Sequence, residues 1–350
     1  MTDSSPLGSA SCEPAADGVR RVLLAVHTGR ADIVDLARSS AARLTRAGLT
    51  VRVLDDEAED LAIPGAEVVA FGPHAADGVE VVIVMGGDGT FLRAAELARE
   101  TDAALTGVNL GKVGFLAETE PETVEETLSA IEQCQYAVEE RLTLAVDVFD
   151  ADGVHTGSTW ALNEASVEKL ERSRVLDVVL AIDGRPLTSF GCDGVLAATP
   201  TGSTAYAFSA GGPVVWPDVE AMLVVPTNAH ALFARPLVTS PDSVLTVAVP
   251  ADGTRARVSA DGRRTVDIPL GGRVDVRRSA RPVRIARVQP RSFGDRLVAK
   301  FGLPVRGFRS ARTGGQHAGP GHELTTSRNV LLRDDTADGP PADGGAHGQG

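Results

Sequence analysis

Short apolar runs and stretches with helical spacing alternate along the first third of the chain. Arg21 to Val26 is a mostly apolar run that predicts a buried strand, and Leu49 to Leu54 predicts a second strand. The residues between them have the spacing of an amphipathic helix that ends at Gly48. Its buried face holds Ile33, Leu36, Ala37, Ser40 and Leu44.

This alternation continues to about residue 131. Val81 to Met85 and Ala104 to Asn109 predict two further strands, and Thr90 to Glu100 predicts the helix between them. Another helix is expected from near Pro121 to Ile131, because proline suits the first turn of a helix. Strands that alternate with helices in this way predict a mainly parallel sheet covered by helices.

The pattern changes near Arg141. Leu142 to Phe149 and Val175 to Ile182 alternate apolar and polar residues with the period of a strand that buries one face. Such segments are separated by Asp-Gly pairs, which favour tight turns. These pairs are Asp152-Gly153, Asp183-Gly184, Asp252-Gly253 and Asp261-Gly262. The second half of the chain is therefore predicted to be β-rich.

These patterns predict two domains and two tails. We expect an α/β domain at residues 19–141, a β-rich domain at residues 142–290, and a segment at residues 291–310 that returns toward the first domain. Residues 1–18 and 311–350 are rich in small and polar residues without periodicity, and we expect them to be disordered. Clefts between two domains are common ligand sites.

Composition and charge exclude several classes of function. The chain has 350 residues and a formal net charge of −13, which argues against nucleic-acid binding because phosphate backbones require clustered Lys and Arg. Its apolar runs are shorter than the roughly 20 residues of a membrane span, and its first residues lack the pattern of a signal peptide. We therefore expect a cytoplasmic protein without a membrane partner. Widely spaced cysteines fit a reducing compartment and offer no metal framework: Cys12, Cys134 and Cys192.

The loop Gly86-Gly87-Asp88-Gly89-Thr90 directly after Met85 is the strongest candidate for chemistry. Its glycines permit positive φ and close approach of a ligand, and backbone N–H groups there can point at a phosphate. A carboxylate repels phosphates, so Asp88 is expected to hold a metal or to accept a proton from a hydroxyl that is being phosphorylated. The alternative is a plain strand-to-helix turn with Asp88 as the helix N-cap, and the loop alone leaves both open.

Other motifs narrow the type of site. Gly86 to Thr90 lacks the spacing of the dinucleotide-binding G-x-G-x-x-G motif, and Gly107 to Lys112 is not followed by the Ser or Thr of a P-loop. A second glycine-containing segment, Asn109 to Leu116, follows the next strand, and open α/β sheets bind ligands at the edge where both loops would lie. Three segments of the β-rich half concentrate hydroxyls, an amide and carboxylates: Asn163-Glu164, Cys192-Asp193-Gly194 and Thr199 to Tyr206.

These motifs, in this order, resemble those of the NAD kinase family. The resemblance covers roughly residues 20 to 310 and includes the Asp261-Gly262 pair. It implies ATP-dependent transfer of a phosphoryl group to the 2′-hydroxyl of the adenosine ribose of NAD, which gives NADP. It also implies a Rossmann-like α/β N-terminal domain, a β-rich C-terminal domain and a homodimer or homotetramer.

The resemblance also implies roles for individual residues. Asp88 is the expected general base on the 2′-hydroxyl. The expected contacts of the donor phosphates are Gly86, Gly87, Gly89 and Thr90. The expected contacts of NAD are Asp88, Gly89, Arg93, Asn163, Glu164, Arg174, Asp193, Thr204, Ala205, Tyr206 and Ser209. Mg²⁺ is expected to arrive with ATP, and neither a protein-held metal nor a prosthetic group is expected.

Several of these residues also fit a purely structural role. Arg93 fits a solvated helix arginine equally well, Arg174 fits a solvated loop, and Tyr206 without its motif fits a half-buried structural tyrosine. Gly191 stands where some members of the family carry a polar or basic side chain, so a contact there would be lost. His230 is more typical of a packed or capping histidine than of an acceptor contact.

Two other functions remain as alternatives. A lipid or sphingoid-base kinase shares the Gly-Gly-Asp-Gly-Thr motif but leaves Asn163-Glu164 and Thr199 to Tyr206 unexplained. A non-catalytic dinucleotide sensor would keep the pocket without chemistry, and the presence of Asp88 disfavours it. The motifs do not distinguish ATP from inorganic polyphosphate as the donor, or NAD⁺ from NADH as the acceptor.

Overall fold

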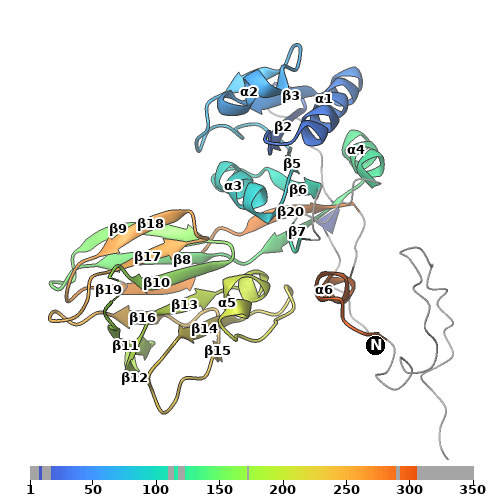
Figure 1. The fold of residues 1–350 in the computed structure, drawn as a ribbon. Coiled ribbons are helices and arrows are strands. Elements are labelled where there is room, and N and C mark those ends of the chain that lie inside the picture. Colours follow the sequence, from blue (N-terminus) through green and yellow to red (C-terminus); the bar gives the residue numbers. More distant parts are fainter. Residues whose placement is uncertain are drawn as a thin grey trace, which may run out of the picture. The chain divides into compact units, whose positions relative to one another are not determined.

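The apolar runs of the first half become neighbouring strands of one sheet in the computed structural model (Figure 1). This structure describes residues 8–9, 17–108, 114–116, 123–171, 173–288 and 292–305. Neighbouring strands are parallel in the order β4-β3-β2-β5-β6. These strands are β2 (Arg21–Val26), β3 (Thr50–Leu54), β4 (Glu67–Val69), β5 (Val81–Met85) and β6 (Ala104–Val108). The predicted mainly parallel, Rossmann-like sheet is confirmed.

Helices cover both faces of this sheet. They are α1 (Ala31–Arg46), α2 (Asp55–Leu61), α3 (Asp88–Ala98) and α4 (Val124–Glu132). Along β2, Val22 and Leu24 join the buried residues of α1 and α4 in one apolar core. Leu23 and Ala25 point the other way and join those of α3 in a second core. A strand buried on both faces is apolar throughout, which is why these strands were predictable from the sequence.

Three more strands extend the sheet beyond β6 in the order β6-β20-β7-β1. They are β20 (Val283–Arg287), β7 (Ala137–Arg141) and β1 (Gly8–Ser9). β20 runs parallel to β6 and antiparallel to β7. The sequence placed residues 283–287 with the β-rich half and residues 1–18 in a disordered tail. Long-range strand pairing, which no local pattern encodes, places β20 and β1 in this sheet instead.

Other differences from the predicted elements are small. α2 and β4 were not predicted, because β4 has only 3 residues and α2 is a strongly acidic segment of 7 residues. α3 begins at Asp88 rather than at Thr90. Pro121, Asn109 to Val113 and most of the two predicted tails lie outside the described residues.

Within the described residues, the second half forms two six-stranded antiparallel sheets, and its predicted β-rich character is confirmed. The first sheet contains β15 (Leu237–Thr239), β14 (Met222–Thr227), β13 (Gly194–Ala198), β10 (Glu164–Lys169), β17 (Ala256–Ala260) and β18 (Arg264–Ile268), in that order. The second contains β12 (Arg185–Cys192), β11 (Leu176–Ile182), β16 (Leu245–Ala248), β19 (Arg273–Arg278), β8 (Leu144–Phe149) and β9 (His155–Ala161). Buried side chains from both sheets share one apolar core.

The Asp-Gly pairs differ in what they do. Asp183-Gly184 joins β11 to β12, and Asp261-Gly262 joins β17 to β18. All four residues have positive φ, as a type I′ hairpin turn requires. Asp252-Gly253, in contrast, lies between β16 and β17, which belong to different sheets.

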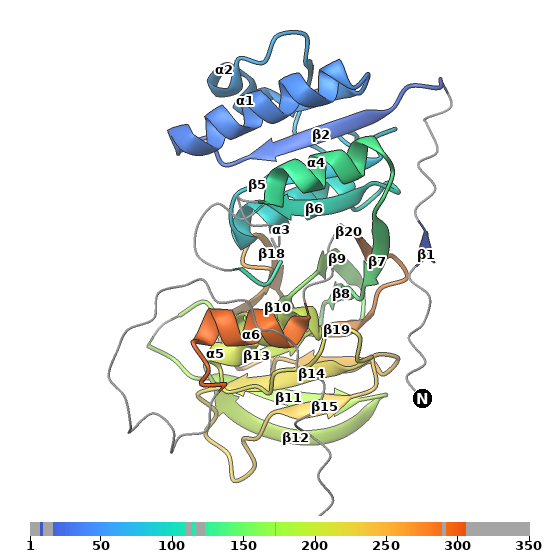
Figure 2. The ribbon, with the colours of Figure 1, turned by 90° about the vertical axis from the view of Figure 1, so that its right-hand side faces the viewer.

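A C-terminal helix, α6 (Phe293–Phe301), is drawn in orange-red in Figure 2, and its aromatic rings contact aromatic rings of both halves. The ring of Phe115, from the first half, lies 6.0 Å from Phe293 and 5.9 Å from Phe301. Trp216 and Phe208, from the second half, lie 5.1 Å from Phe293 and 4.7 Å from Phe301, respectively. The helix and the three sheets belong to one compact unit that extends to Leu303.

Two further observations bear on the sequence predictions. None of the helices in the described part of the chain has the length and apolar character needed to span a membrane. Cys134 takes part in a disulfide bond, which the wide spacing of the cysteines did not predict, whereas Cys192 is a buried free thiol.

Candidate functional site

The glycine loop follows β5, at the point in the sheet where successive strands begin to be added on the opposite side. β3 lies beside β2 on one side of this point, and β6 lies beside β5 on the other. Ligands of open α/β sheets bind beyond the carboxyl ends of the strands at such a point. The N–H of His27 donates to the carbonyl of Met85 (2.9 Å), and the N–H of Gly86 donates to the carbonyl of Val108 (3.1 Å). The start of the loop is therefore tied to both neighbours of β5.

Asp88 is the first residue of α3, and Gly87 is the N-cap. The Asp88 carboxylate accepts hydrogen bonds from the N–H groups of Phe115 (3.2 Å, Oδ2) and Leu116 (3.1 Å, Oδ1). A Cβ at Gly114 would lie 2.4 Å from Oδ1 of Asp88, so a larger residue there would displace this carboxylate. The alternative of Asp88 as N-cap is wrong. The predicted meeting of the two glycine-containing loops is confirmed for residues 114–116.

The glycines around Asp88 act through their small size rather than through positive φ. None of Gly86, Gly87 and Gly89 has a positive φ, so the expectation from sequence is wrong on this point. A Cβ at Gly86 would lie 2.5 Å from Oγ1 of Thr90, whereas a Cβ at Gly87 or Gly89 would meet nothing within 4 Å. Gly86 is needed for packing, and Gly87 and Gly89 leave the backbone of the loop accessible to a ligand.

Strand register brings three other motifs to one edge of a sheet. β10 lies between β13 and β17 and is antiparallel to both, with Glu164 opposite Ala198 and Ala165 opposite Ala260. The residues that follow β13 and β17 therefore lie beside those that precede β10. The segments brought together are Asn163-Glu164, Thr199 to Thr204, and Asp261-Gly262.

Asp261 holds the backbone of the first of these segments. Its carboxylate accepts hydrogen bonds from the N–H groups of Leu162 (3.0 Å), Asn163 (2.7 Å) and Glu164 (3.3 Å). The guanidinium of Arg264 donates to the same carboxylate (2.7 Å). Burial raises the pKa of Asp261, and the backbone N–H groups and Arg264 act in the opposite direction. The role of this carboxylate is to fix the loop.

The turn of residues 199–204 also packs against residues 162–163. The N–H of Thr199 donates to the carbonyl of Asn163 (2.9 Å), and its hydroxyl donates to the carbonyl of Leu162 (2.6 Å). A Cβ at Gly202 would lie 2.0 Å from the carbonyl oxygen of Asn163. This contact permits no side chain, which explains the glycine of the Thr-Pro-Thr-Gly motif.

The side chains of Asn163 and Glu164 are buried and keep polar atoms without partners. Oδ1 of Asn163 and Oε2 of Glu164 have no hydrogen-bond partner among the described residues. Burial raises the pKa of Glu164 to about 7, the charge of Asp261 adds to this, and a hydrogen bond from the N–H of Tyr206 opposes it. An unpaired buried polar atom costs about 1–3 kcal/mol. A ligand that donates hydrogen bonds to these two oxygens would remove this cost.

Asp193 and Tyr206 are further predicted contacts in this half. Asp193 pairs with Lys169 and accepts a hydrogen bond from Asn228 (2.8 Å), and both interactions lower the pKa of its carboxyl. Tyr206 is 43% exposed and begins α5 (Tyr206–Ser209), and burial and nearby carboxylates raise its pKa. The same turn carries the other predicted contacts at half-buried or exposed positions: Thr204, Ala205 and Ser209.

Two predicted contacts have acidic partners. Arg93 forms ion pairs with Asp56 and Glu57 of α2. Arg174 pairs with Glu171 (3.2 Å), and its side chain is 63% exposed. The described contacts of both arginines group them with these carboxylates rather than with the other candidate residues.

Sequence patterns missed several residues near these positions. Glu57 is buried, accepts a hydrogen bond from the N–H of Val26 (2.8 Å), and has a pKa raised to about 7, chiefly by burial. It belongs to an acidic stretch that is typical of a solvated helix. Lys169 and Asn228, which hold Asp193, carry no local signal because their partner is distant in sequence.

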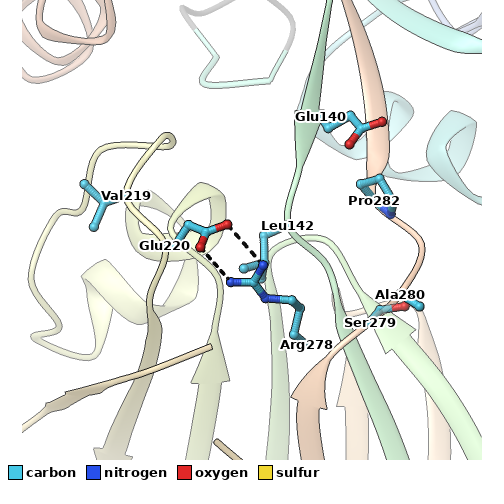
Figure 3. Close-up of a pocket in the computed structure, with 8 residues that line it drawn as sticks. All are labelled: Glu140, Leu142, Val219, Glu220, Arg278, Ser279, Ala280 and Pro282. Atoms are coloured by element: carbon cyan, nitrogen blue, oxygen red, sulfur yellow. Dashed lines mark hydrogen bonds and ion pairs between the residues drawn. The ribbon is translucent and has the colours of Figure 1, made fainter. Parts of the chain in front are cut away.

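The cavity in Figure 3 is separate from these residues. It has a volume of about 300 Å³ and is lined by Glu140, Leu142, Val219, Glu220, Arg278, Ser279, Ala280 and Pro282. None of the predicted site residues lines it. In the part of the chain that the structure describes, no group of three or more His, Cys, Asp or Glu side chains is arranged to hold a metal ion.

Comparison with protein families gives two matches. The ATP-NAD kinase N-terminal domain matches residues 22–136, and the ATP-NAD kinase C-terminal domain matches residues 162–288. NAD kinase 2 of Streptomyces avermitilis is 56% identical over 295 residues, which cover 83% of this chain and 97% of that protein. The NAD kinase of Mycobacterium leprae is 53% identical over 308 residues, which cover 85% of this chain and 99% of that protein.

Solved structures show the same fold. Yeast NADH kinase complexed with NADH has a TM-score of 0.72 at 21% identity, and the match covers 86% of this chain and 90% of that chain. An NAD kinase from Archaeoglobus fulgidus in complex with ATP has a TM-score of 0.61 at 26% identity, covering 82% of this chain and 100% of that chain.

The close contact between Gly202 and Asn163 leads to a prediction about stability. We expect Gly202→Ala to lower the free energy of unfolding by at least roughly 1–3 kcal/mol, because the added methyl group overlaps backbone atoms. Urea denaturation measures this change. Gly72→Ala is the matched control, since a Cβ there meets nothing within 4 Å. Equal stability of the two variants would contradict the described packing.

The raised pKa of Glu164 makes a second prediction. Its folded-state pKa of about 7 lies above the ordinary value of 4.5, so the folded protein binds more protons than the unfolded chain between these pH values. Stability contributed by this group therefore falls as pH rises through that window. We expect the stability of Glu164→Gln relative to the wild type to grow from about pH 4.5 to 7 and then level off. Urea denaturation across this range tests it, and a difference independent of pH would refute it.

Proposed function

Because the chain belongs to the NAD kinase family, we propose that it transfers the terminal phosphoryl group of ATP to the 2′-hydroxyl of the adenosine ribose of NAD⁺, with Asp88 as general base. The family resemblance inferred from the motifs is confirmed by matches over both halves of the chain. These matches favour the NAD kinase family over a lipid or sphingoid-base kinase. The yeast and Archaeoglobus structures, which contain NADH and ATP respectively, support a dinucleotide acceptor and ATP as the donor.

The observation that carries the proposal is the way in which Asp88 is held. Its carboxylate is half-buried at the start of α3, and two N–H groups from residues 115–116 fix its orientation. A general base must be positioned before its pKa matters. As the ribose oxygen forms a bond to the γ-phosphorus, its proton passes to Asp88, the bond from the γ-phosphorus to the β–γ bridging oxygen breaks, and ADP leaves.

The donor phosphates are proposed to bind at the glycine loop. The backbone at Gly87 and Gly89 is accessible, and the N-terminus of α3 favours an anion. Mg²⁺ enters with ATP as part of the substrate and neutralises phosphate charge. Gly86 and Thr90 support the loop through their mutual contact rather than through an open face.

The acceptor is proposed to bind at the Asn163 segment. Oδ1 of Asn163 and Oε2 of Glu164 are acceptors that suit sugar hydroxyls and amide N–H groups. The exposed ring of Tyr206 offers a stacking surface. The Asp193 carboxylate offers a further polar contact. Thr204, Ala205 and Ser209 complete the proposed contacts, and Arg93 and Arg174 stay predictions because both already have acidic partners.

We also propose a cytoplasmic homodimer or homotetramer, as the family resemblance implies. Light scattering on the purified protein at several concentrations measures the mass of the assembly. A mass equal to that of the 36.3 kDa chain at all concentrations would refute the oligomer.

The assignment of the base makes a third prediction. Asp88→Asn keeps an oxygen that can accept one of the two N–H bonds but removes the base, so we expect kcat to fall by roughly 10²- to 10⁴-fold. NAD⁺ binding, measured by calorimetry, should change far less. Asp102→Asn is the control, because that side chain is fully exposed. A near-normal kcat in Asp88→Asn would exclude the base.

The same assay separates the alternative functions and donors. Purified protein is supplied with NAD⁺ or NADH, Mg²⁺ and either ATP or inorganic polyphosphate, and NADP(H) is measured with a dependent dehydrogenase. Product with ATP and NAD⁺ supports the proposal. Binding of NAD⁺ without product from any donor would point to a dinucleotide sensor.

A further inference from the structure

The helix that begins with Asp88 is joined by one ion-pair chain to the loop that carries Asn163 and Glu164. Glu96 lies on α3, eight residues after Asp88, and its carboxylate pairs with Arg264 at the start of β18. Arg264 also donates to Oδ2 of Asp261 (2.7 Å), which holds the backbone N–H groups of the Asn163 segment. Figure 2 shows α3 next to β18.

The surroundings of Arg264 hold its guanidinium in place. The guanidinium lies 4.4 Å from the centre of the Trp160 ring and donates to the Trp160 carbonyl (2.9 Å). The side chains of Arg264 and Glu96 are 23% and 17% exposed, and that of Asp261 is 1% exposed. Such partly buried, multiply bonded pairs are far more sensitive to loss of one partner than pairs on the open surface.

The chemistry of the contact requires arginine. Nη1 of Arg264 reaches Glu96, and Nη2 reaches both Asp261 and the Trp160 carbonyl. A planar guanidinium can satisfy these acceptors at once, whereas a lysine ammonium of the same charge cannot reproduce the fork. Charge alone is therefore not what this position supplies.

We infer that Glu96 and Arg264 are positioning residues that fix the position of Asp88 relative to the segment of Asn163 and Glu164. This inference rests on the proposed function. At one end of this series of ion pairs, Glu96 fixes α3, whose first residue is the base. The other end fixes Asp261, and through it the three N–H groups that shape the Asn163 segment. Neither residue touches substrate in this scheme, and both act through the geometry of groups that do.

Arg263 supplies a matched control. It donates to the same Glu96 carboxylate (2.8 Å), and its side chain is 34% exposed. Its described contacts include neither Asp261 nor the Trp160 carbonyl. Arg263→Gln therefore removes a positive partner of Glu96 while it leaves the link from Arg264 to Asp261 intact.

The test measures kcat, KM for ATP, NAD⁺ affinity and thermal stability in Arg264→Lys, Glu96→Gln, Arg263→Gln and the double variant of the first two. We expect Arg264→Lys and Glu96→Gln to lower kcat roughly 10- to 100-fold, because a misplacement of about 1 Å at a reacting group costs up to about 10²-fold. KM for ATP should stay unchanged, and Arg263→Gln should keep the wild-type kcat. The double variant should lose no more than the stronger single variant, because both residues belong to one chain.

Two outcomes would overturn the inference. One is an unchanged kcat in folded Arg264→Lys and Glu96→Gln, whether or not their thermal stability falls, and the other is an equal loss of kcat in Arg263→Gln. Glu96→Gln provides the readout from the other end of the chain if Arg264→Lys does not fold. A wild type that forms no NADP⁺ would instead refute the proposed function, so the two failures are distinguishable.

Discussion

The buried carboxylate of Asp261 is the interaction on which the candidate site depends. Three consecutive N–H groups, those of residues 162–164, donate hydrogen bonds to it. Removing a carboxylate from water is costly, and these N–H groups and Arg264 offset that cost. The type I′ turn at Asp261-Gly262 makes the arrangement possible, because it places the carboxylate at the end of β17, beside the start of β10.

The same carboxylate influences the chemistry of its neighbour. Glu164 and Asp261 are both buried, and the negative charge of Asp261 adds to burial in raising the pKa of Glu164. A carboxyl with a pKa of about 7 is present in both protonation states near neutral pH. Glu164 can therefore accept a hydrogen bond from a sugar hydroxyl in one state and donate one in the other.

How much the sequence predicted depended on how local each signal was. Strands buried on both faces, such as β5, and the glycine loop after it carry continuous local patterns and were predicted within a residue or two. Residues 283–287 were placed in the β-rich domain, because no local pattern encodes the pairing of β20 with β6 and β7. Arg93 was ambiguous for a related reason, since its partners lie on α2, a short helix that was not predicted. The contact between Glu96 and Arg264 joins residues 168 positions apart and has no local signature.

The motif glycines act in a different way from the one that their sequence suggests. Glycine in a loop suggests positive φ, yet Gly86, Gly87 and Gly89 do without it. At Gly202 a Cβ would overlap the backbone of Asn163, and at Gly114 it would displace the Asp88 carboxylate. Hydrogen bonds from the N–H groups of Phe115 and Leu116 hold the Asp88 carboxylate, and close packing of Gly202 against the backbone of Asn163 holds the second segment. In a reaction that consists mainly of positioning and charge neutralisation, that rigidity is the principal contribution the chain can make.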